Sequence, residues 1–245
     1  MKILLNPLTL FYFLFILSIG SAIHLIYGSC QTSRWHYIIQ TYYVSEKLPH
    51  WLFVKSKATV GGVITKDRIK VYADYAGTWY SWYKNGDMRD SGEYINGIKE
   101  GEYKSWHKNR TLASLNYYND NNFIGEQNYW FNNKQHQYKC AYEFNEKQGT
   151  QIQWFKNGKV KETSNWINGR LNGKYQSWYK TGEANIFRIY FNGDISLSKA
   201  WYPNGNRKFK ERYVEGKRDG EQKQWYRNGT IKEIIYYNND QRIYK

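Results

Sequence analysis

The sequence predicts an all-β protein, an elongated single-layer antiparallel meander of seven β-hairpin repeats. The first observation behind this prediction is a Trp that recurs through the last two-thirds of the chain at steps of 24 residues, with one step of 23. The second is an Asn-Gly dipeptide between β-prone runs, which is a strong hairpin signal and recurs with the same period. The repeats occupy residues 77–245, and their markers are Trp82, Trp106, Trp130, Trp154, Trp178, Trp201 and Trp225.

Each repeat carries two candidate turns. One follows the Trp, as at Asn157-Gly158, and the other comes eleven residues later, as at Asn168-Gly169. We expect both to be two-residue type I′ turns, because Gly adopts positive φ freely and Asn tolerates it. Symmetric pairing about the first turn then places the aromatic residue after each Trp opposite an aliphatic residue, as in Tyr83 and Met88. The Trp residues fall on the opposite face.

Two stretches of the repeats, "GKYQSWYKTGEANIFRIYFNG" and "GEQKQWYRNGTIKEIIYYNND", resemble the MORN-repeat variants of bacterial proteins. Members of that group are often labelled as antitoxin components of toxin–antitoxin systems. The resemblance covers about residues 77–245 and implies an elongated sheet of stacked hairpins used for binding. The second and third units depart from the pattern, because Asn109-Arg110 and Asn133-Lys134 replace Asn-Gly, which puts type I′ turns in doubt there.

Residues 1–30 differ in kind, because a long uncharged run follows Lys2. Its apolar core is short enough for a signal peptide cleaved after Ala22. The run from Leu8 to Tyr27 is also long enough to span a bilayer as a retained anchor. A third interpretation is a lipoprotein signal with Cys30 as the lipidated residue, and a fourth buries the segment in a soluble fold. The first three place the protein at the cell envelope, membrane-anchored or exported.

Residues 31–76 lack the repeat period and hold three strand-like runs, at 35–44, 51–54 and 69–75. We expect an irregular β cap there that covers the edge of the first hairpin, because an open sheet edge invites aggregation. The chain therefore divides into a signal peptide or membrane anchor at 1–30, a cap at 31–76 and the repeats at 77–245.

The chain is strongly basic, with a formal net charge of +15 and a pI near 9.5. This balance favours an anionic partner, although nucleic acid is not expected behind an export or anchor segment. In five repeats a Lys or Arg precedes the first-turn Asn position and would line one edge of the sheet at intervals of about 9.6 Å. This cationic ladder is either an anion-binding edge or a solvated margin. Its members are Lys84, Lys108, Lys156, Lys180 and Arg227.

Nothing in the repeat is chemically reactive, so we expect no enzyme, no cofactor and no metal site. His107 stands in an aromatic position of the repeat, and His136 is expected opposite Phe131, so both replace structural residues. Cys140 is expected to be a small apolar side chain. The seven Trp markers either pack within the sheet or form an exposed stripe that docks a partner, since a single-layer sheet has no second layer to cover them.

Three functions remain open. The first is a scaffold that binds a protein partner at the cell envelope, in its sharpest form an antitoxin or immunity protein. The second is a module that binds membrane lipid or another anionic polymer through the basic edge. The third is the binding of cell-wall glycan.

Overall fold

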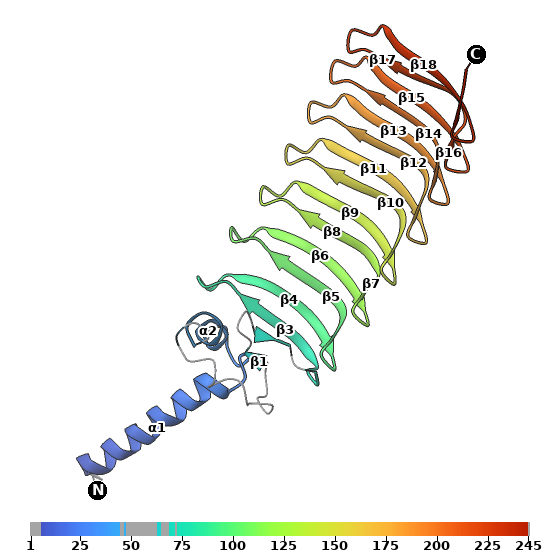
Figure 1. Ribbon diagram of the computed structural model, residues 1–245. Helices are drawn as coiled ribbons and strands as arrows, with labels where there is room; N and C mark the ends of the chain where they lie inside the picture. The colour runs from blue at the N-terminus through green and yellow to red at the C-terminus, as the bar shows by residue number, and fades with distance from the viewer. Residues whose placement is uncertain (1–5, 45–46, 48–62, 65–68, 72, 245) are drawn as a thin grey trace. The chain divides into compact units, whose positions relative to one another are not determined.

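The computed structural model of the chain describes residues 6–44, 47, 63–64, 69–71 and 73–244. Strands β3 to β19 form an antiparallel meander of 17 strands (Figure 1), so the predicted all-β meander is confirmed. The chain divides into two compact units. We call Met1–Gly101 the N-terminal unit and Glu102–Lys245 the C-terminal unit.

Helix α1 (Pro7–Tyr27) begins at an N-cap that its own sequence supplies. The Asn6 side chain accepts a hydrogen bond from the backbone N–H of Leu8 at 3.0 Å, and Pro7 holds the first helical position, where its missing N–H costs nothing. The stretch Pro7–Ile26 has a mean hydropathy of 2.0 and none of it is buried. The helix is therefore long and apolar enough to cross a membrane, and a signal sequence has the same properties.

The predicted strand at 35–44 is wrong, because helix α2 (Arg34–Ile39) and the π-helix η1 (Gln40–Val44) occupy this stretch. The residue that decides is Ser33, whose side chain accepts a hydrogen bond from the backbone N–H of His36 at 3.1 Å. This N-cap outweighs the β propensity of the aromatic and β-branched residues that follow. The strands of the N-terminal unit are β1 (Val63–Ile64), β2 (Ile69–Lys70), β3 (Gly77–Trp82) and β4 (Met88–Ile95).

Side chains of the lead-in bond to the backbone of the first hairpin. The Gln31 amide accepts from the backbone N–H of Tyr80 at 3.0 Å and donates to the Tyr80 carbonyl at 2.9 Å. The Tyr42 hydroxyl donates to the Trp82 carbonyl at 2.9 Å. These contacts support the edge cap, which we retain as a proposal. The predicted strand at 69–75 is reduced to β2, and the one at 51–54 lies outside the described residues.

The C-terminal unit consists of successive antiparallel hairpins that lie side by side (Figure 1). The strand β5 (Ile98–Trp106) contains the boundary between the units. Each Trp marker ends the first main strand of its repeat, and the second main strand follows the first turn. Both strands are rich in aromatic and β-branched residues. The remaining strands are β6 (Leu112–Asn119), β7 (Asn122–Phe123), β8 (Gly125–Trp130), β9 (His136–Glu143), β10 (Glu146–Trp154), β11 (Val160–Ile167), β12 (Arg170–Trp178), β13 (Ala184–Phe191), β14 (Asp194–Trp201), β15 (Arg207–Val214), β16 (Lys217–Arg218), β17 (Gly220–Trp225), β18 (Ile231–Asn238) and β19 (Gln241–Ile243).

The second turn of the repeat has the predicted two-residue geometry. Asn168 and Gly169 have positive φ angles of 48° and 70°, and the flanking residues Ile167 and Arg170 pair directly. Positive φ at both central residues defines the type I′ turn, whose twist matches that of the strands. The same conformation occurs without Gly at 120–121, where φ is 49° and 62°.

The first turn has a different geometry, so the type I′ prediction is wrong there. The backbone N–H of Gly158 donates to the Phe155 carbonyl at 2.9 Å, and the N–H of Phe155 donates to the Lys159 carbonyl at 2.8 Å. Among residues 155–159 only Gly158 has positive φ, at 84°. This is the three-residue hairpin loop in which a type I turn is followed by one left-handed residue.

The extra loop residue shifts the cross-strand register by one. Trp82 itself pairs with Met88, so the expected pairing of Tyr83 with Met88 is wrong. The same shift places His136 opposite Trp130 instead of opposite the following aromatic residue. The Trp markers, and not their aromatic neighbours, therefore share a face with the residues that begin the next strand.

Two glutamine side chains bridge places where the ladder between repeats is interrupted. Gln127 accepts from the backbone N–H of Tyr117 at 3.3 Å and donates to the carbonyls of Tyr117 and Ile124 at 3.1 and 2.7 Å. Gln222 makes the equivalent pair of bonds with the Arg212 backbone, at 3.0 and 2.9 Å. Both are buried, and they replace strand hydrogen bonds. The buried layer of this unit also includes Cys140, Gln151, Ser164 and Ser198.

Candidate binding surface along the first turns

The cationic ladder residues share one structural position, the first of the three residues in the first-turn loop. In the C-terminal unit Lys108, Lys156, Lys180 and Arg227 hold it, and all four are exposed. Lys84 holds the same position in the N-terminal unit, where its ammonium lies 4.8 Å from the centre of the Tyr43 ring. That distance is within cation–π range.

In four repeats the recurrent Asn links its first turn to the next. The Asn133 side-chain oxygen accepts from the backbone N–H of Gln135 at 3.3 Å and so closes its own turn. Its amide nitrogen donates to the carbonyl of Lys156, a ladder residue of the next turn, at 2.8 Å. This Asn is therefore selected for a link between turns and not for positive φ. The same link is made by Asn109, Asn157 and Asn204 at 2.7, 3.3 and 2.9 Å.

In the second, fifth and sixth repeats the residue after the Trp adds a second link between repeats, which Phe131 and Phe155 cannot make because they have no polar atom. The Tyr202 hydroxyl donates to the Trp225 carbonyl at 2.9 Å. His107 replaces a Tyr in this role, because its Nε2 lies 2.8 Å from the carbonyl oxygen of Trp130. A hydrogen bond there requires the tautomer that carries the proton on Nε2.

The Trp markers of the C-terminal unit form what we call the Trp column, together with their cross-strand partners. The His136 ring lies between Trp130 and Trp154, with ring centroids 5.4 and 5.3 Å away. The Arg207 guanidinium lies 5.9 Å from the centre of the Trp225 ring. All seven Trp markers are half-buried, so packing within the sheet takes up much of their surface. Docking of a partner on them stays a prediction.

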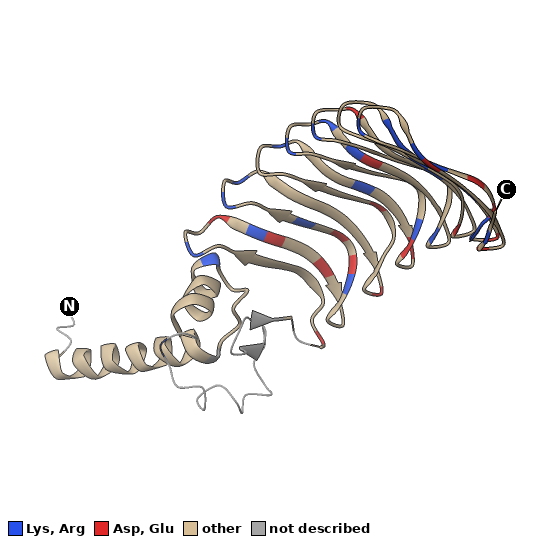
Figure 2. Ribbon diagram, turned by 45° about the horizontal axis from the view of Figure 1, so that its top comes forward, with Lys and Arg blue, Asp and Glu red and all other residues tan. Residues whose placement is uncertain are grey.

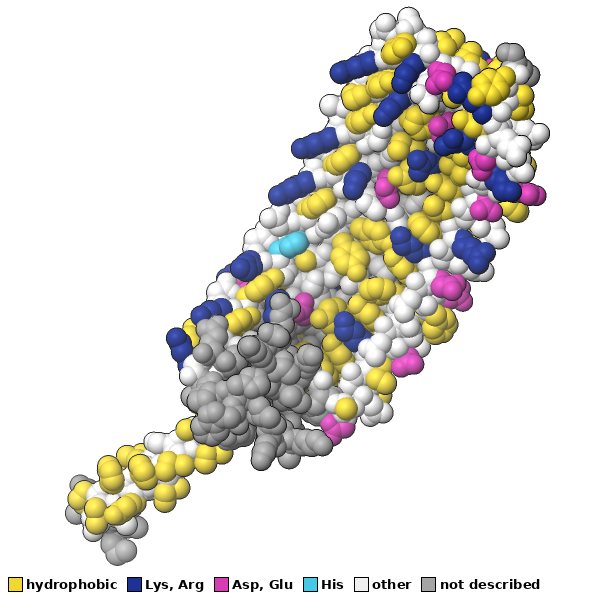
Figure 3. Space-filling view, in the orientation of Figure 1, with side chains coloured by type: hydrophobic (Ala, Val, Ile, Leu, Met, Phe, Trp, Pro, Cys, Tyr) yellow, Lys and Arg dark blue, Asp and Glu magenta, His cyan; other side chains and the backbone are white. Residues whose placement is uncertain are grey.

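Charge is segregated along the C-terminal unit. In the seven residues after each Trp marker, Lys and Arg outnumber carboxylates by eleven to one, and all eleven are exposed. Around the second turns, the comparable windows are the seven residues that begin one position before each turn. Together these windows contain five Lys and Arg and seven Asp and Glu. Lys and Arg positions recur along the first turns in the ribbon of Figure 2, and their side chains recur along the same edge in Figure 3. This first-turn margin consists of Lys108, Arg110, Lys134, Lys156, Lys159, Lys161, Lys180, Arg207, Lys208, Arg227 and Lys232.

A hollow of about 560 Å³ opens between two neighbouring first turns beside the Trp column. The cations Arg110 and Lys134 and the indole of Trp130 contribute to its lining. The volume falls within the range of small-molecule sites, roughly 300–1,000 Å³. Cations next to an aromatic wall suit an anionic group that carries an apolar part.

The candidate lipidation residue, Cys30, is 1% exposed. Burial raises the pKa of its thiol to about 11, against a smaller opposing effect of the Gln31 amide, whose nitrogen lies 3.7 Å from the sulfur. Burial likewise raises the pKa of Cys140, which is 0% exposed, as befits a small core side chain. Both thiols are therefore held neutral and away from solvent at pH 7.

A row of exposed apolar residues at the second turns was missed in the sequence. Ile167, Phe191 and Val214 each come just before a second turn in successive repeats, and they are 54%, 75% and 59% exposed. Phe144, inside its own turn, is 60% exposed. We call these four residues the apolar row. The sequence did contain a signal for this row, because an apolar residue recurs beside the second turn with the repeat period. Residues at turns are otherwise mostly polar.

A profile of the family described as MORN repeat variant matches the chain at residues 147–168 and 218–239. Both matches begin seven residues before a marker, Trp154 and Trp225, so they share one register of the repeat. No curated protein matches the chain. MORN repeats are generally non-enzymatic and often associated with membranes or proteins, and nothing links this chain to a toxin–antitoxin family. The resemblance to MORN-repeat variants is thus supported at two places in the array, as a repeat scaffold.

Proposed function

We propose that the protein is a membrane-anchored, non-enzymatic scaffold that binds anionic lipid surfaces through its first-turn margin. The observation that carries this proposal is the charge segregation, with eleven exposed Lys and Arg against one carboxylate. Each basic residue close to an anionic bilayer contributes about 1 kcal/mol, so a row binds strongly although one residue does not. Helix α1 supports the same function, since a membrane anchor raises the local concentration of lipid around the repeats.

The links between turns support a lipid surface in particular. The Asn side chains hold successive ladder carbonyls one repeat apart, about 9.6 Å for two strands. Backbone spacing is therefore fixed while the long side chains above it stay mobile. Such a row suits a fluid surface of many equivalent headgroups, because it requires regular charge and no single ligand geometry.

Vesicle binding by the protein lacking residues 1–30 tests the proposal, with circular dichroism to verify the β fold of each variant. We expect Lys108→Gln/Lys156→Gln/Lys180→Gln to weaken binding to anionic vesicles by at least about tenfold, because three contributions of about 1 kcal/mol are lost. Binding of the parent should also fall as salt rises to 0.15 M, where exposed charges are screened within about 8 Å.

A matched control removes the same charge elsewhere. Arg170→Gln/Lys174→Gln/Lys217→Gln changes three exposed cations outside the margin and should leave vesicle binding nearly intact. Equal losses in both triple variants would show that net charge, and not the margin, is responsible. A parent protein that ignores anionic vesicles at low salt would rule out the lipid function.

The apolar row favours a second candidate, a scaffold that binds a protein partner at the cell envelope. Exposed apolar side chains at a regular interval mark interaction sites, and this row lies away from the cationic margin. In its sharpest form the partner is a toxin and the protein an antitoxin or immunity protein. Neutralisation of a toxin encoded beside it by the parent, and not by Ile167→Ser/Phe191→Ser, would support this candidate. Loss of neutralisation only in the Lys108, Lys156 and Lys180 triple variant would exclude the apolar row as the surface that binds the toxin.

A further inference from the structure

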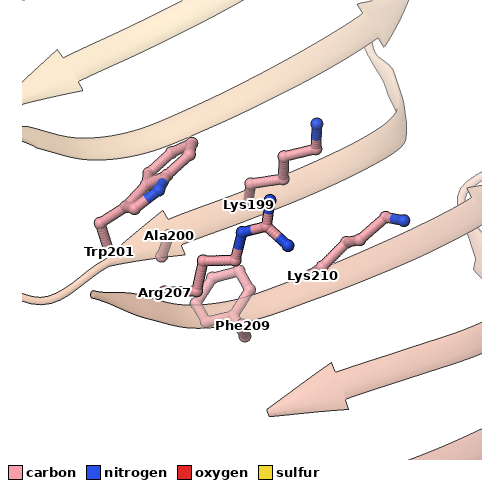
Figure 4. A pocket seen from close by; sticks show the side chains of 6 residues that line it. All are labelled: Lys199, Ala200, Trp201, Arg207, Phe209 and Lys210. Atoms are coloured by element: carbon pink, nitrogen blue, oxygen red, sulfur yellow. The ribbon is translucent and has the colours of Figure 1, made fainter. Parts of the chain in front are cut away.

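A small cationic hollow lies between β14 and β15 in the sixth repeat. Its volume is about 140 Å³. Lys199, Arg207 and Lys210 project from the sheet on the same side as the indole of Trp201 (Figure 4). Lys199 and Lys210 belong to strand interiors and are half-buried, so they lie outside the first-turn margin. The hollow is completed by Ala200 and Phe209.

The lysines of this site are directly opposite one another on paired β-strands. Lys199 pairs with Lys210, and Lys210 pairs with Lys223 on the next strand. Like charges directly opposite across strands destabilise a sheet. Three lysines in one cross-strand row therefore form an arrangement that the fold alone does not favour.

In the third and seventh repeats a strand lysine pairs with a glutamate. Glu221 is held by Lys223 at 2.9 Å and Glu126 by Lys139 at 2.6 Å, and both glutamates stand one residue after the Gly that opens their repeat. In the sixth repeat that position is Leu197. Within the described residues, no carboxylate forms an ion pair with Lys199, Arg207 or Lys210. The hydrogen bond from Lys223 lowers the pKa of the Glu221 carboxyl group, and the nearby charge of Lys210 adds to this effect. The ion pair of Glu221 is nevertheless with Lys223, so Lys199, Arg207 and Lys210 share no carboxylate of their own in the part of the chain that the structure describes.

We propose that this hollow binds the phosphate group of a phosphomonoester. A phosphomonoester carries up to two negative charges and three terminal oxygens near neutral pH, which match two ammonium groups and one guanidinium fork. The hollow is several times the ~30 Å³ share of a water molecule but smaller than a drug-sized site, so it suits the phosphate group and not a whole large ligand. The Trp201 indole offers an apolar wall to the esterified carbon.

Two sources share this chemistry, a soluble phosphate ester and a lipid with a terminal phosphate. The full-length protein in detergent is titrated calorimetrically with glycerol 3-phosphate and with inorganic phosphate, at constant ionic strength set by sodium chloride. The same protein in detergent is titrated with mixed micelles that contain phosphatidic acid, a monoester, against mixed micelles of equal charge that contain phosphatidylglycerol, a diester. Binding to the soluble ester assigns a soluble source, and binding to phosphatidic acid alone assigns a lipid source; either supports the site.

The decisive variant is Leu197→Glu, which introduces the glutamate that the second, third and seventh repeats carry at this position and keeps every cation in place. We expect it to reduce affinity for the monoester by at least about tenfold, as should Lys199→Gln/Lys210→Gln. Thr150→Glu, the same change at the same position of the fourth repeat, should keep affinity within about twofold. Lys156→Gln/Lys180→Gln, which removes equal charge from the margin, should keep affinity for glycerol 3-phosphate within about twofold, so this site and the lipid margin are tested separately.

Two results would overturn the proposal. One is a parent protein that shows no binding of glycerol 3-phosphate above the sodium chloride control and binds phosphatidic acid no more tightly than phosphatidylglycerol. The other is monoester binding by Leu197→Glu and Lys199→Gln/Lys210→Gln that equals that of the parent. Thermal unfolding provides a second measurement, because a ligand that binds only the folded state raises the Tm. Glycerol 3-phosphate should raise the Tm of the parent and of Thr150→Glu, and leave that of Leu197→Glu unchanged.

Discussion

The third residue of the first-turn loop carries a backbone conformation that most side chains resist. Gly158 holds it at φ 84°, whereas Arg110 and Lys134 hold it at φ 66° and 70° in their repeats. A non-Gly residue in the left-handed region costs roughly 1–2 kcal/mol. Two repeats therefore carry local strain that the other first turns avoid, and their neighbours must stabilise it.

Substitution at this position should change stability in opposite directions. Lys134→Gly should raise the free energy of unfolding by about 1 kcal/mol, because it relieves the left-handed strain. Gly158→Val should lower it, since a Cβ at Gly158 would lie 2.9 Å from the Gln135 side-chain oxygen and a β-branched residue resists this φ. Urea unfolding measures both. Lys156→Gly, at the first loop position, relieves no strain and should not stabilise; a gain there equal to that of Lys134→Gly would refute the argument.

At the scale of elements, the glutamine bridges replace part of the ladder between hairpins. The side-chain amide of Gln222 presents one donor and one acceptor to the Arg212 backbone, as a neighbouring strand would. A buried backbone group without such a partner costs about 1–3 kcal/mol. One side chain therefore supplies part of the hydrogen bonding between the sixth and seventh repeats, beside the links from Tyr202 and Asn204.

Removal of that side chain should weaken the junction. Gln222→Ala should reduce the free energy of unfolding by about 2 kcal/mol, because it leaves the N–H of Arg212 unpaired and the Arg212 carbonyl with only the bond from the Asp219 N–H, at 3.1 Å. Hydrogen exchange should show faster loss of protection at the Arg212 amide than elsewhere in β15. Gln224→Ala is the matched control, since Gln224 lies in the same strand and makes no side-chain hydrogen bond among the described residues. Equal effects of the two variants would show that the bridge contributes nothing.

The elements also show what sequence can and cannot predict. The 24-residue period predicted the meander and the second turn, because both depend on local chemistry. The same Asn-Gly dipeptide serves the first turn, where the decisive bonds join different repeats, as from Asn133 to Lys156. Helix α2 was missed because β-prone side chains dominate it and only Ser33 signals its start. The phosphate site depends on the ladder register that pairs Lys199 with Lys210.

At the scale of the whole molecule, one apolar helix and a basic repeat array belong to the same chain. Helix α1 contributes no buried residue within Pro7–Ile26, and its ring contact with the described fold is that of His24 with His36, whose centroids are 4.7 Å apart. Cys30 follows it closely and is buried. In the membrane-anchored protein that we propose, attachment depends on a retained helix, on a lipid at Cys30, or on both.

Deletion and substitution separate these modes of attachment. Removal of residues 1–30 should release the protein from membranes into the soluble fraction, because the apolar surface of α1 is lost. If a retained helix anchors the protein, Cys30→Ala should stay in the membrane fraction. If a lipid on Cys30 anchors it, Cys30→Ala should move to the soluble fraction. Fractionation followed by immunodetection measures both variants. A truncated protein that still sediments with membranes after a high-salt wash would contradict anchoring by this segment.

The stacking of hairpins in the C-terminal unit has a mechanical consequence. Hydrogen bonds between antiparallel strands run perpendicular to the strands, hence along the direction in which the hairpins follow one another. Tension between the first and last hairpins therefore acts parallel to these hydrogen bonds. The bonds break one strand pair after another, so the array unfolds one hairpin at a time. Each repeat of 24 residues that is released adds about 80 Å of extended chain. The scaffold yields stepwise under load, so pulling force sets how far its last repeats reach.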